Sequence, residues 1–427
     1  MNRAEFKRPI VIKGELTLPG DKSISHRAVL FSALAKGESS IRNLSRAEDV
    51  QSSINCIRAL GAECELSDGI YRISSPGLRG FTKPARELYA GNSGTTARLL
   101  AGILAILPFE TTITGDESLS RRPMNRVMQP LSLFGTKFQA AEGDRLPVRI
   151  LPARNLTSVK YTLPVASAQI KSAVLLAGLG LDEVSQVIEN LQSRDHTERM
   201  LNLPFAEING IRFTNSSSAF IPEPDAYFVP GDISSAAFFV VAALLIPGSE
   251  LLIKNVTLNP TRNGYITHLK KMGADITFEN LQTSANEPYG DILIRSGDLK
   301  NVPITPELIP NLIDEIPVLA VAGYFAEGEF EVRGAEELRV KESDRIAALI
   351  HNFTLAGAHV TEYKDGFRLQ RSDKRTDPVF ESFHDHRIAM AFAIFSLLLA
   401  DGGKIDNFDC VKISNPDFIH QLSLITG

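Results

Sequence analysis

The sequence predicts an α/β protein made of six copies of one supersecondary unit, arranged as two similar domains. One observation is that a β-rich segment and a second, more amphipathic helix follow most of six apolar helices. Units of this length bury their apolar faces against copies of themselves, and the chain is too long for one core, so we expect two cores of three units each. The apolar helices recur about every 70 residues, beginning near Asp21, Asn92, Ala168, Asp232, Asp314 and Asp385.

Each kind of element has a local reason. The first helices, such as IKSAVLLAGLG and AAFFVVAALLIPG, are apolar on nearly every face, which predicts burial on most sides. The segments after them predict strands: SSIRNL, TTITG, SQVIEN, ELLIKNV, EFEVRG and KIDNF. Second helices, usually closed by a capping glycine, are predicted in AEDVQSSINCIRALGA, PMNRVMQPLSLFG, NGYITHLKKMGA and ESDRIAALIHNFTLAGA.

Composition limits the classes of function. With 45 Lys+Arg against 50 Asp+Glu, the net charge is -5, which argues against nucleic acid as a partner. Cys56, Cys64 and Cys410 are an odd number without metal-site spacing, so we expect no disulfides and no metal, as in a reducing cytoplasm. The start lacks an apolar signal core, and the longest apolar stretch, near Ala236 to Pro247, is too short to span a bilayer. We therefore expect a cytoplasmic protein with no membrane partner.

Polar and basic residues gather where the helices begin. Ser, Asp and Asn at helix starts are ordinary N-caps, but caps do not need the neighbouring cations. Helix N-termini present unpaired N–H groups and a partial positive charge, which bind phosphates and carboxylates. The sequence therefore predicts a site for small polyanions. The cations include Lys22, Arg121, Arg122, Arg194, Arg262, Arg339, Lys341, Arg345 and Arg387.

Ten ordered motifs resemble one known family over nearly the whole chain. They are PGDKSISHRA, GNSGTTARLL, RRPMNRV, SAQIKSA, RDHTERML, PGDISSAAFF, NPTRNG, LIDEIPVLA, RVKESDRI and DHRIAMAFA, and they resemble the signatures of 5-enolpyruvylshikimate-3-phosphate synthase. The resemblance implies two domains of three βαβαββ units each, the enolpyruvyl transferase fold. It places the first domain at residues 1–20 and 231–427 and the second at 21–230, with the active site in a cleft between them.

The resemblance also implies the reaction. The enolpyruvyl group of phosphoenolpyruvate moves to the 5-hydroxyl of shikimate 3-phosphate, releasing phosphate through a tetrahedral intermediate, without a cofactor or metal. Asp314, Glu342 and Lys22 match the catalytic positions. Asp314 would handle the sugar-like hydroxyl, and Glu342 would move the proton at the methylene carbon. Because the two carboxylates come from different helix starts, their pKa values can differ as acid and base roles require.

The same comparison implies the ligand-binding residues. Guanidinium groups suit the carboxylate and phosphate of phosphoenolpyruvate, since they offer paired donors. The residues expected to bind phosphoenolpyruvate are Lys22, Asn92, Gly94, Arg122, Gln169, Arg345 and Arg387. Those expected to bind shikimate 3-phosphate are Lys22, Ser23, Arg27, Ser167, Ala168, Gln169, Arg194, Asp314 and Lys341.

Some positions depart from the family pattern. Many members have a lysine near the C-terminus where this chain has Ile413, and Lys412 is one position away and is not assigned a role. GDKS, SAQIK, RDHTE and NPTR resemble the glyphosate-tolerant class II subgroup. Tolerance in that subgroup is linked to an alanine where this chain has Gly94. His386 is either a site residue or a packed or capping histidine.

Two alternatives remain open. UDP-N-acetylglucosamine enolpyruvyl transferase shares the fold and donor, but it commonly has a reactive cysteine where this chain reads GDESLSRRP. A repeat scaffold that binds partners would need exposed aromatic anchors, and this chain has 7% aromatic residues and no Trp. We expect a monomeric enzyme whose domains close on small-molecule substrates, hinged at chain crossings near Gly20 and Gly231 only.

Overall fold

The computed structural model describes residues 3–372 and 378–426. By its internal contacts the chain divides into two compact units, each with its own hydrophobic core. Unit 1 comprises Met1–Pro19, Pro230–Gln282 and Pro288–Gly427. Unit 2 comprises Gly20–Val229 and Thr283–Glu287. The predicted α/β class is confirmed.

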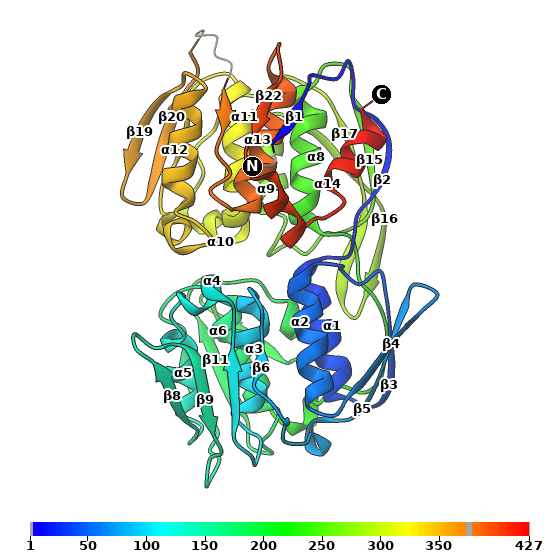
Figure 1. Cartoon of the computed structure of the whole chain (residues 1–427), viewed down its shortest axis with the longest axis vertical. Helices are drawn as coiled ribbons and strands as arrows, with labels where there is room; N and C mark the ends of the chain where they lie inside the picture. Colours follow the sequence, from blue (N-terminus) through cyan, green and yellow to red (C-terminus); the bar gives the residue numbers. More distant parts are fainter. Residues whose placement is uncertain (1–2, 373–377, 427) are drawn as a thin grey trace. The chain divides into compact units, whose positions relative to one another are not determined.

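The six apolar helices are present and form the centres of the cores. Each begins within about two residues of its predicted start, the usual uncertainty of a helix end. In Figure 1, α8, α11 and α13 lie side by side, and each contacts the other two. Burial on all faces is clearest in α13, where only Arg387 is not buried, and α8 has two such residues, Ser235 and Leu245. The helices are α1 (Lys22–Leu34), α3 (Gly94–Leu104) and α6 (Ala168–Gly178) in unit 2, and α8 (Ile233–Leu245), α11 (Ile316–Phe325) and α13 (His386–Leu398) in unit 1.

Unit 2 contains three four-stranded sheets of one pattern. In each sheet the first two strands named are parallel and the other pairs are antiparallel. In two of the sheets the parallel strands are joined across a buried helix, β6 to β7 through α3 and β10 to β11 through α6. The orders are β14 (Ala226–Phe228)-β3 (Lys36–Arg42)-β5 (Ile70–Pro76)-β4 (Glu63–Ser67), β6 (Leu88–Tyr89)-β7 (Thr111–Thr114)-β9 (Arg145–Leu151)-β8 (Lys137–Ala141) and β10 (Lys160–Thr162)-β11 (Ser185–Glu189)-β13 (Ile211–Ser216)-β12 (Phe205–Ile208).

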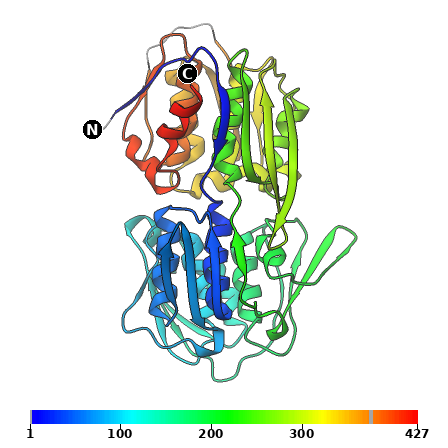
Figure 2. The same cartoon turned by 90° about the vertical axis from the view of Figure 1, so that its right-hand side faces the viewer.

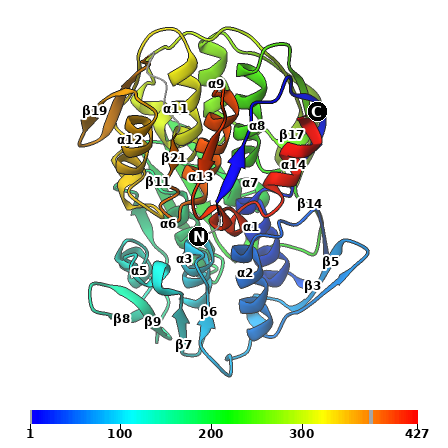
Figure 3. The same ribbon diagram turned by 45° about the horizontal axis from the view of Figure 1, so that its top comes forward.

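Unit 1 repeats the pattern less regularly. Among the described residues two of its sheets have three strands, so the predicted six identical units are an idealisation. The N-terminal segment, dark blue in Figure 2, supplies β2, which is parallel to β15, and β1, labelled in Figure 3, which is antiparallel to β22. The orders are β16 (Asp275–Ser284)-β17 (Glu287–Arg295)-β15 (Glu250–Thr257)-β2 (Lys13–Thr17), β18 (Phe330–Val332)-β20 (Gly366–Gln370)-β19 (His359–Tyr363) and β1 (Ala4–Phe6)-β22 (Gly403–Ile405)-β21 (Val379–Phe380).

The second helices cover the sheets and carry the remaining site segments. The four that were predicted are all present. In the third and sixth repeats the same place is taken by α7, which has five residues, and by α14, which has eight. Two further single turns are α4, which precedes a second helix, and α10, which precedes a first helix. The bounds are α2 (Glu48–Ala59), α4 (Glu117–Ser120), α5 (Asn125–Ser132), α7 (His196–Met200), α9 (Gly264–Lys271), α10 (Ile309–Leu312), α12 (Arg345–Leu355) and α14 (Phe418–Ile425).

The expectation of only two chain crossings is wrong. The turn between β16 and β17, Thr283–Glu287, belongs to unit 2, which adds two further crossings. Glu287 is buried there, with Oε1 2.8 Å from His196 Nδ1. The expected hinge position Gly20 also has a packing reason, because a Cβ there would lie 2.0 Å from the carbonyl oxygen of Asn43. A close approach of backbone therefore accounts for this glycine.

One helical run is longer than the apolar stretch near Ala236 to Pro247, but acidic residues interrupt it. The helical run Pro306–Phe325 is long and apolar enough to cross a membrane by length and composition alone. It joins the 3-10 turns Pro306–Leu308 and Ile313–Glu315 to α10 and α11. Of its most apolar window, 67% is buried inside the structure, as in a core helix.

Candidate functional site

The start of α1 in unit 2 presents Lys22 beside a carboxylate. Asp21 caps the helix by accepting a hydrogen bond from Ile24 N at 2.9 Å, and the next side chain is Lys22. Lys22 Nζ lies 3.0 Å from Asp49 Oδ2 in the first turn of α2. Lys22 and Ser23 are both partly exposed. The helix start therefore offers an ammonium group that is oriented by Asp49 and accessible to a ligand.

Arg27, one turn further along α1, points into unit 2. Its Nε donates to Thr197 Oγ1 at 2.8 Å, and one terminal nitrogen donates to Ser172 Oγ at 2.9 Å. The other terminal nitrogen donates to Ser23 O at 3.0 Å. Arg27 is buried, so it joins α1 to α6 and α7 from within. Contact with shikimate 3-phosphate would use only those guanidinium donors that these bonds leave over.

A buried chain of hydrogen bonds connects the starts of α1, α2 and α3. His26 Nδ1 and Ser53 Oγ are 2.8 Å apart, and Ser53 Oγ is 2.8 Å from Thr96 Oγ1. Thr96 Oγ1 donates to Ser93 Oγ, the N-cap of α3, at 2.8 Å. Burial lowers the pKa of His26 to about 3, with Asp49 opposing the shift and Lys22 adding to it. His26 is therefore neutral at neutral pH.

This histidine predicts a dependence of stability on pH. The pKa of His26 is lower in the folded chain than its ordinary 6.5, so the unfolded chain binds the proton more readily. Stability contributed by the neutral ring is complete above pH 6.5 and is lost as the pH falls toward 3. We expect His26→Gln to flatten the loss of unfolding free energy between pH 7.5 and 5 by roughly 2 kcal/mol. Chemical unfolding at both pH values measures it. The exposed His420→Gln is the control, and an equal slope in both variants would contradict the assignment.

Asn92, Gly94 and Arg122, all expected to bind phosphoenolpyruvate, lie together at the start of α3. Arg122 donates from a terminal nitrogen to Asn92 Oδ1 at 2.9 Å, while Asn92 Nδ2 donates to Asp116 Oδ2 at 2.7 Å. A Cβ at Gly94 would lie 3.7 Å from Arg122 Nη1. Asn92 and Arg122 are partly exposed. The helix start and this guanidinium together can hold an anionic group.

Gln169 joins the start of α6 to α3. Its Oε1 accepts from Arg98 Nη1 at 2.8 Å, and its Nε2 donates to Thr95 Oγ1 at 3.1 Å. The side chain of Ser167, the N-cap position of α6, makes no capping bond, and both Ser167 and Ala168 are partly exposed. Arg98 was given no role from the sequence. Its position one turn after Gly94 was the signal available.

In unit 1, Asp314 lies between two cations. It belongs to the 3-10 turn Ile313–Glu315 that leads into α11. Asp314 Oδ1 is 3.5 Å from Lys341 Nζ and 3.4 Å from Arg345 Nη1. Both cations attract this carboxylate. Asp314 and Lys341 are partly exposed, so both can reach a ligand.

Arg345 lies at the centre of three carboxylates, those of Asp314, Glu342 and Asp385. It is 1% exposed, and its Nη2 lies 2.6 Å from Glu342 Oε2 while its Nε lies 2.8 Å from Asp385 Oδ2. Burial alone would lower the pKa of Arg345, but Asp385, Glu342 and Asp314 raise it. Burial alone would raise the pKa of Asp385, and Arg345 lowers it below the ordinary value. Arg345 thus binds three carboxylates at once, with Glu342 the exposed member.

Arg387 completes this part of the site. It is the second residue of α13, and Asp385 caps that helix by accepting from Arg387 N at 2.9 Å. Arg387 Nη1 donates to Asp314 O at 2.9 Å and lies 3.5 Å from Glu315 Oε1. Glu315 accepts a hydrogen bond from Ser234 Oγ, to which buried Arg262 donates at 2.5 Å. The starts of α8, α11 and α13 are therefore connected through polar side chains.

The remaining candidate residues differ in their exposure. Arg194 is partly exposed, ahead of α7. His386 is buried as the first residue of α13. Lys412 is exposed and pairs with Asp409 at 2.7 Å. Within the described part of the chain, no group of three or more His, Cys, Asp or Glu could hold a metal ion.

The three cysteines are free thiols. Cys56 and Cys64 are buried in the core of unit 2, and Cys410 is partly buried. Burial raises the pKa of Cys56 to about 12 and that of Cys410 to about 11. Their thiolate forms, the reactive ones, are therefore scarce at neutral pH.

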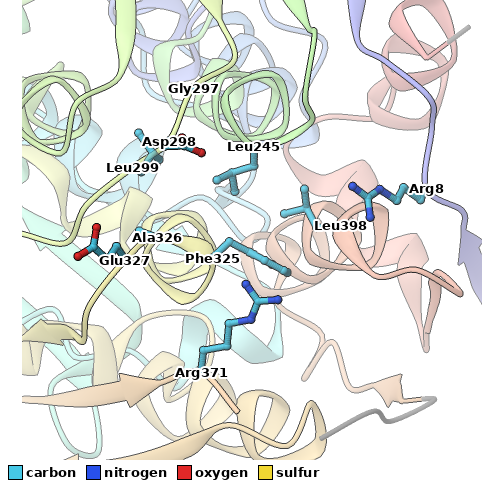
Figure 4. Close-up of a pocket in the computed structure, with 10 residues that line it drawn as sticks. All are labelled: Arg8, Leu245, Gly297, Asp298, Leu299, Phe325, Ala326, Glu327, Arg371 and Leu398. Atoms are coloured by element: carbon cyan, nitrogen blue, oxygen red, sulfur yellow. The ribbon is translucent and has the colours of Figure 1, made fainter. Parts of the chain in front are cut away.

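A cavity of about 590 Å³ in unit 1 contains none of the expected site residues (Figure 4). Leu245, Phe325 and Leu398 line it, and they stand at the C-terminal ends of α8, α11 and α13. Arg8 and Arg371 lie at its edge. The expected residues of unit 1 lie at the opposite, N-terminal ends of these helices. The cavity is therefore separate from the candidate site.

Comparisons with known proteins agree on one family. The sequence model of EPSP synthase (3-phosphoshikimate 1-carboxyvinyltransferase) matches residues 7–422. A 3-phosphoshikimate 1-carboxyvinyltransferase of Petrotoga mobilis is 46% identical over 412 residues, covering 95% of each chain. EPSP synthase from Acinetobacter baumannii has a TM-score of 0.86 and 38% identity, over 99% of this chain and 98% of that one.

A more distant structure shares the fold. The enolpyruvyl transferase NikO from Streptomyces tendae has a TM-score of 0.73 at 14% identity, over 99% of this chain and 96% of that chain. At that identity only the fold is shared. The family match and these relatives span nearly the whole chain, so they favour the EPSP synthase family over both alternatives, the UDP-N-acetylglucosamine enolpyruvyl transferase and the repeat scaffold. The chain belongs to the EPSP synthase family and is an enzyme, a 3-phosphoshikimate 1-carboxyvinyltransferase that uses shikimate 3-phosphate and phosphoenolpyruvate.

Proposed function

We propose that Asp314, Glu342 and Lys22 carry out enolpyruvyl transfer in this chain. The observation that supports this most directly is the cluster in unit 1. There Arg345 contacts both Asp314 and Glu342, and Lys341 lies 3.5 Å from Asp314. Two carboxylates held by one guanidinium, yet differing in exposure, suit separate acid and base roles.

In the proposed addition step, the 5-hydroxyl oxygen of shikimate 3-phosphate bonds to C2 of phosphoenolpyruvate. Asp314 receives the hydroxyl proton, and Glu342 gives a proton to the methylene carbon, C3. In the elimination step, Glu342 takes a proton back from C3, the C2–O bond to phosphate breaks, and phosphate leaves with the proton that Asp314 had received. Lys22 and Lys341 balance the negative charge of the reacting groups. Protons and electrons balance over the two steps without a metal.

The expected binding residues are assigned to the two ligands, some of them to both. We propose that phosphoenolpyruvate contacts Lys22, Asn92, Gly94, Arg122, Gln169 and Arg387, with Arg345 acting mainly through the carboxylates that it holds. For shikimate 3-phosphate we propose the group around α1, α6 and α7 with the two polar residues of unit 1. These are Lys22, Ser23, Arg27, Ser167, Ala168, Gln169, Arg194, Asp314 and Lys341.

The direct test is an assay of phosphate release with purified protein and phosphoenolpyruvate. Shikimate 3-phosphate is compared with UDP-N-acetylglucosamine as the acceptor, and EDTA is added in a parallel series. We expect release with the first acceptor only, and equal rates with and without EDTA. Release with the second acceptor would contradict the proposal, and loss of rate with EDTA would contradict the metal-free mechanism.

We also propose that the chain is of the class II subgroup by its motifs. Because it has Gly94 where tolerance in that subgroup is linked to an alanine, we expect it to be more sensitive to glyphosate than a chain with alanine there. A Cβ at Gly94 would lie 2.5 Å from Arg98 Nη1, which donates to Gln169. Gly94→Ala must therefore displace Arg98. We expect it to raise the KM for phosphoenolpyruvate by about tenfold and the inhibition constant of glyphosate by more. Gly297→Ala is the control, since its Cβ would meet nothing within 4 Å. Equal kinetics in both variants would contradict the steric argument.

We further propose that the active site lies between the two units and that they close on the ligands. Lys22, Arg122 and Arg194 belong to unit 2, and Lys341 and Arg387 to unit 1. These cations would repel without ligand and be bridged by two dianions. We expect a smaller radius of gyration by small-angle scattering when shikimate 3-phosphate and a donor analogue are both added. Measurement at low and high salt is the control. An unchanged radius with both ligands would contradict closure.

The expected setting is a cytoplasmic monomer without a nucleic acid or membrane partner. The free thiols and the net charge of -5 support it. Light scattering during size-exclusion chromatography tests the oligomeric state. A mass near twice 46.7 kDa would contradict the monomer.

A further inference from the structure

Lys171 is a fully buried charged residue in the first turns of α6. It is 0% exposed, although the segment IKSAVLLAG is otherwise the apolar body of a core helix. Its Nζ lies 2.8 Å from Glu189 Oε2 and 2.7 Å from Glu198 Oε1, and both carboxylates are buried. A buried ion cluster is a poor source of stability compared with apolar packing, so its geometry suggests another purpose.

The cluster holds one turn of the chain. Glu189 ends β11, Glu198 belongs to α7, and the turn between them contains Ser193. Glu189 Oε1 accepts from both Ser193 N at 3.1 Å and Ser193 Oγ at 2.6 Å. Lys171 Nζ donates to Ser193 O at 3.3 Å. Ser193 is therefore held through its side chain and through both of its backbone polar groups.

The residue that follows is Arg194. Within the stretch from Ser193 to Glu198, all of it described, Arg194 is the only residue that is not buried. At the other end of the cluster, Lys171 N donates to Ser167 O at 3.0 Å, so the same residue is tied to the start of α6. Lys171 thus links the turn that carries Arg194 to the segment that carries Ser167, Ala168 and Gln169.

The charges in the cluster can balance without solvent. Burial raises the pKa of Glu198, and the negative charge of Glu189 adds to the shift while Lys171 opposes it. A proton retained on Glu198 would leave one ammonium and one carboxylate, a neutral pair. The cluster can therefore persist as a fixed internal brace.

We propose that Lys171 is a positioning residue for acceptor binding, which fixes the Arg194 turn against the start of α6 through Glu189 and Ser193. It touches no substrate itself. The inference rests on the proposed role of Arg194 in binding shikimate 3-phosphate. It implies that the affinity for the acceptor depends on the buried network behind the Arg194 turn.

The test uses Ser193→Ala in the full chain, because it removes one hydroxyl and leaves the backbone bond to Glu189. Ser75→Ala is the matched control: Ser75 is also buried in unit 2, and its Oγ donates to Ala33 O at 2.6 Å. We expect Ser193→Ala to raise the Kd for shikimate 3-phosphate by about tenfold in titration calorimetry, against less than twofold for Ser75→Ala. The KM for phosphoenolpyruvate and the kcat at saturating acceptor should change less than about threefold.

Two further variants separate positioning from simple stability. In an Arg194→Ala background, adding Ser193→Ala should weaken acceptor binding no further, since the turn would have no guanidinium to position. Ser193→Thr keeps a hydroxyl and should recover most of the affinity. If Lys171→Met folds, it should raise the Kd for shikimate 3-phosphate more than Ser193→Ala does. If Lys171→Met does not fold, the result for Ser193→Ala alone tests the positioning role.

Each outcome is decisive. If Arg194→Ala weakens binding but Ser193→Ala equals Ser75→Ala, the positioning role is wrong and the proposed function stands. The role is equally wrong if the effects of Ser193→Ala and Arg194→Ala add in full. If Arg194→Ala binds shikimate 3-phosphate normally, the assignment of Arg194 fails, and this inference fails with it.

Discussion

Glu342→Gln is expected to lower kcat by about two or more powers of ten while leaving the affinity for shikimate 3-phosphate nearly unchanged. Glutamine has the same shape and keeps an oxygen that can accept from Arg345, which lies 2.6 Å from Glu342 Oε2. What it loses is the carboxyl proton that the addition step delivers to C3 and the elimination step removes. The proton transfer should therefore fail while the acceptor contacts remain.

Two controls make this result specific. Glu362→Gln changes another glutamate of unit 1 that pairs with an arginine, Arg339, at 2.8 Å, and it should leave kcat unchanged. Arg122→Ala should instead raise the KM for phosphoenolpyruvate most, because it removes a donor group beside Asn92. Steady-state kinetics and titration calorimetry measure these effects. If Glu342→Gln and Arg122→Ala lost acceptor affinity equally, the division of roles would be wrong.

Arg345→Met is expected to have the largest effect on stability, lowering the unfolding free energy by about 3–5 kcal/mol. The guanidinium is 1% exposed and contacts Asp314, Glu342 and Asp385, so its removal takes away the cation with which the buried carboxylate of Asp385 pairs. Turnover should also be lost, since Asp314 and Glu342 would no longer be held. Chemical unfolding of the variant and the unaltered chain at neutral pH provides the measurement.

The pH dependence identifies the cause. In the unaltered chain Arg345 holds the pKa of Asp385 below its ordinary value of 3.8, so the stability of this pair is complete above that pH and is lost below it. Without Arg345, burial raises the pKa of Asp385, and protonation relieves the variant as the pH falls. Its deficit should therefore shrink between pH 7 and 5. Arg368→Met, which breaks an exposed pair with Glu331, should change stability at neither pH, and an equal loss in both variants would contradict the argument.

Much of the fold was predictable because its determinants are local. Helices such as α8 are apolar on every face, and a pattern of that kind can be read from the residues without knowing what packs against them. Repetition then indicated two cores. The pairing of the N-terminal strands with distant strands was not predictable. β2 pairs with β15 and β1 pairs with β22, each more than 200 residues away along the chain. A short strand does not reveal which distant edge it completes, because pairing depends on backbone groups that every residue has.

The candidate site was predictable as a set of residue types and only in part as a set of contacts. Charged side chains at helix starts indicated anion binding, and Asn92, Gly94 and Arg122 do lie together. The sequence did not show that Arg27 and Arg345 face inward, or that Arg98 lies against Gln169. The direction of a long side chain depends on which partners surround it after folding, and these partners come from other helices.

The sequence by itself determined the class of fold, the six buried helices, the family and the chemical character of the site, since each depends on residue type and spacing along the chain. Only the tertiary structure decided which carboxylate each cation holds, where Thr283–Glu287 belongs, and why an apolar helix carries Lys171. A buried charge is stable only where its counter-charges meet it in space. Glu189 and Glu198 meet Lys171 only after β11, α6 and α7 have packed together.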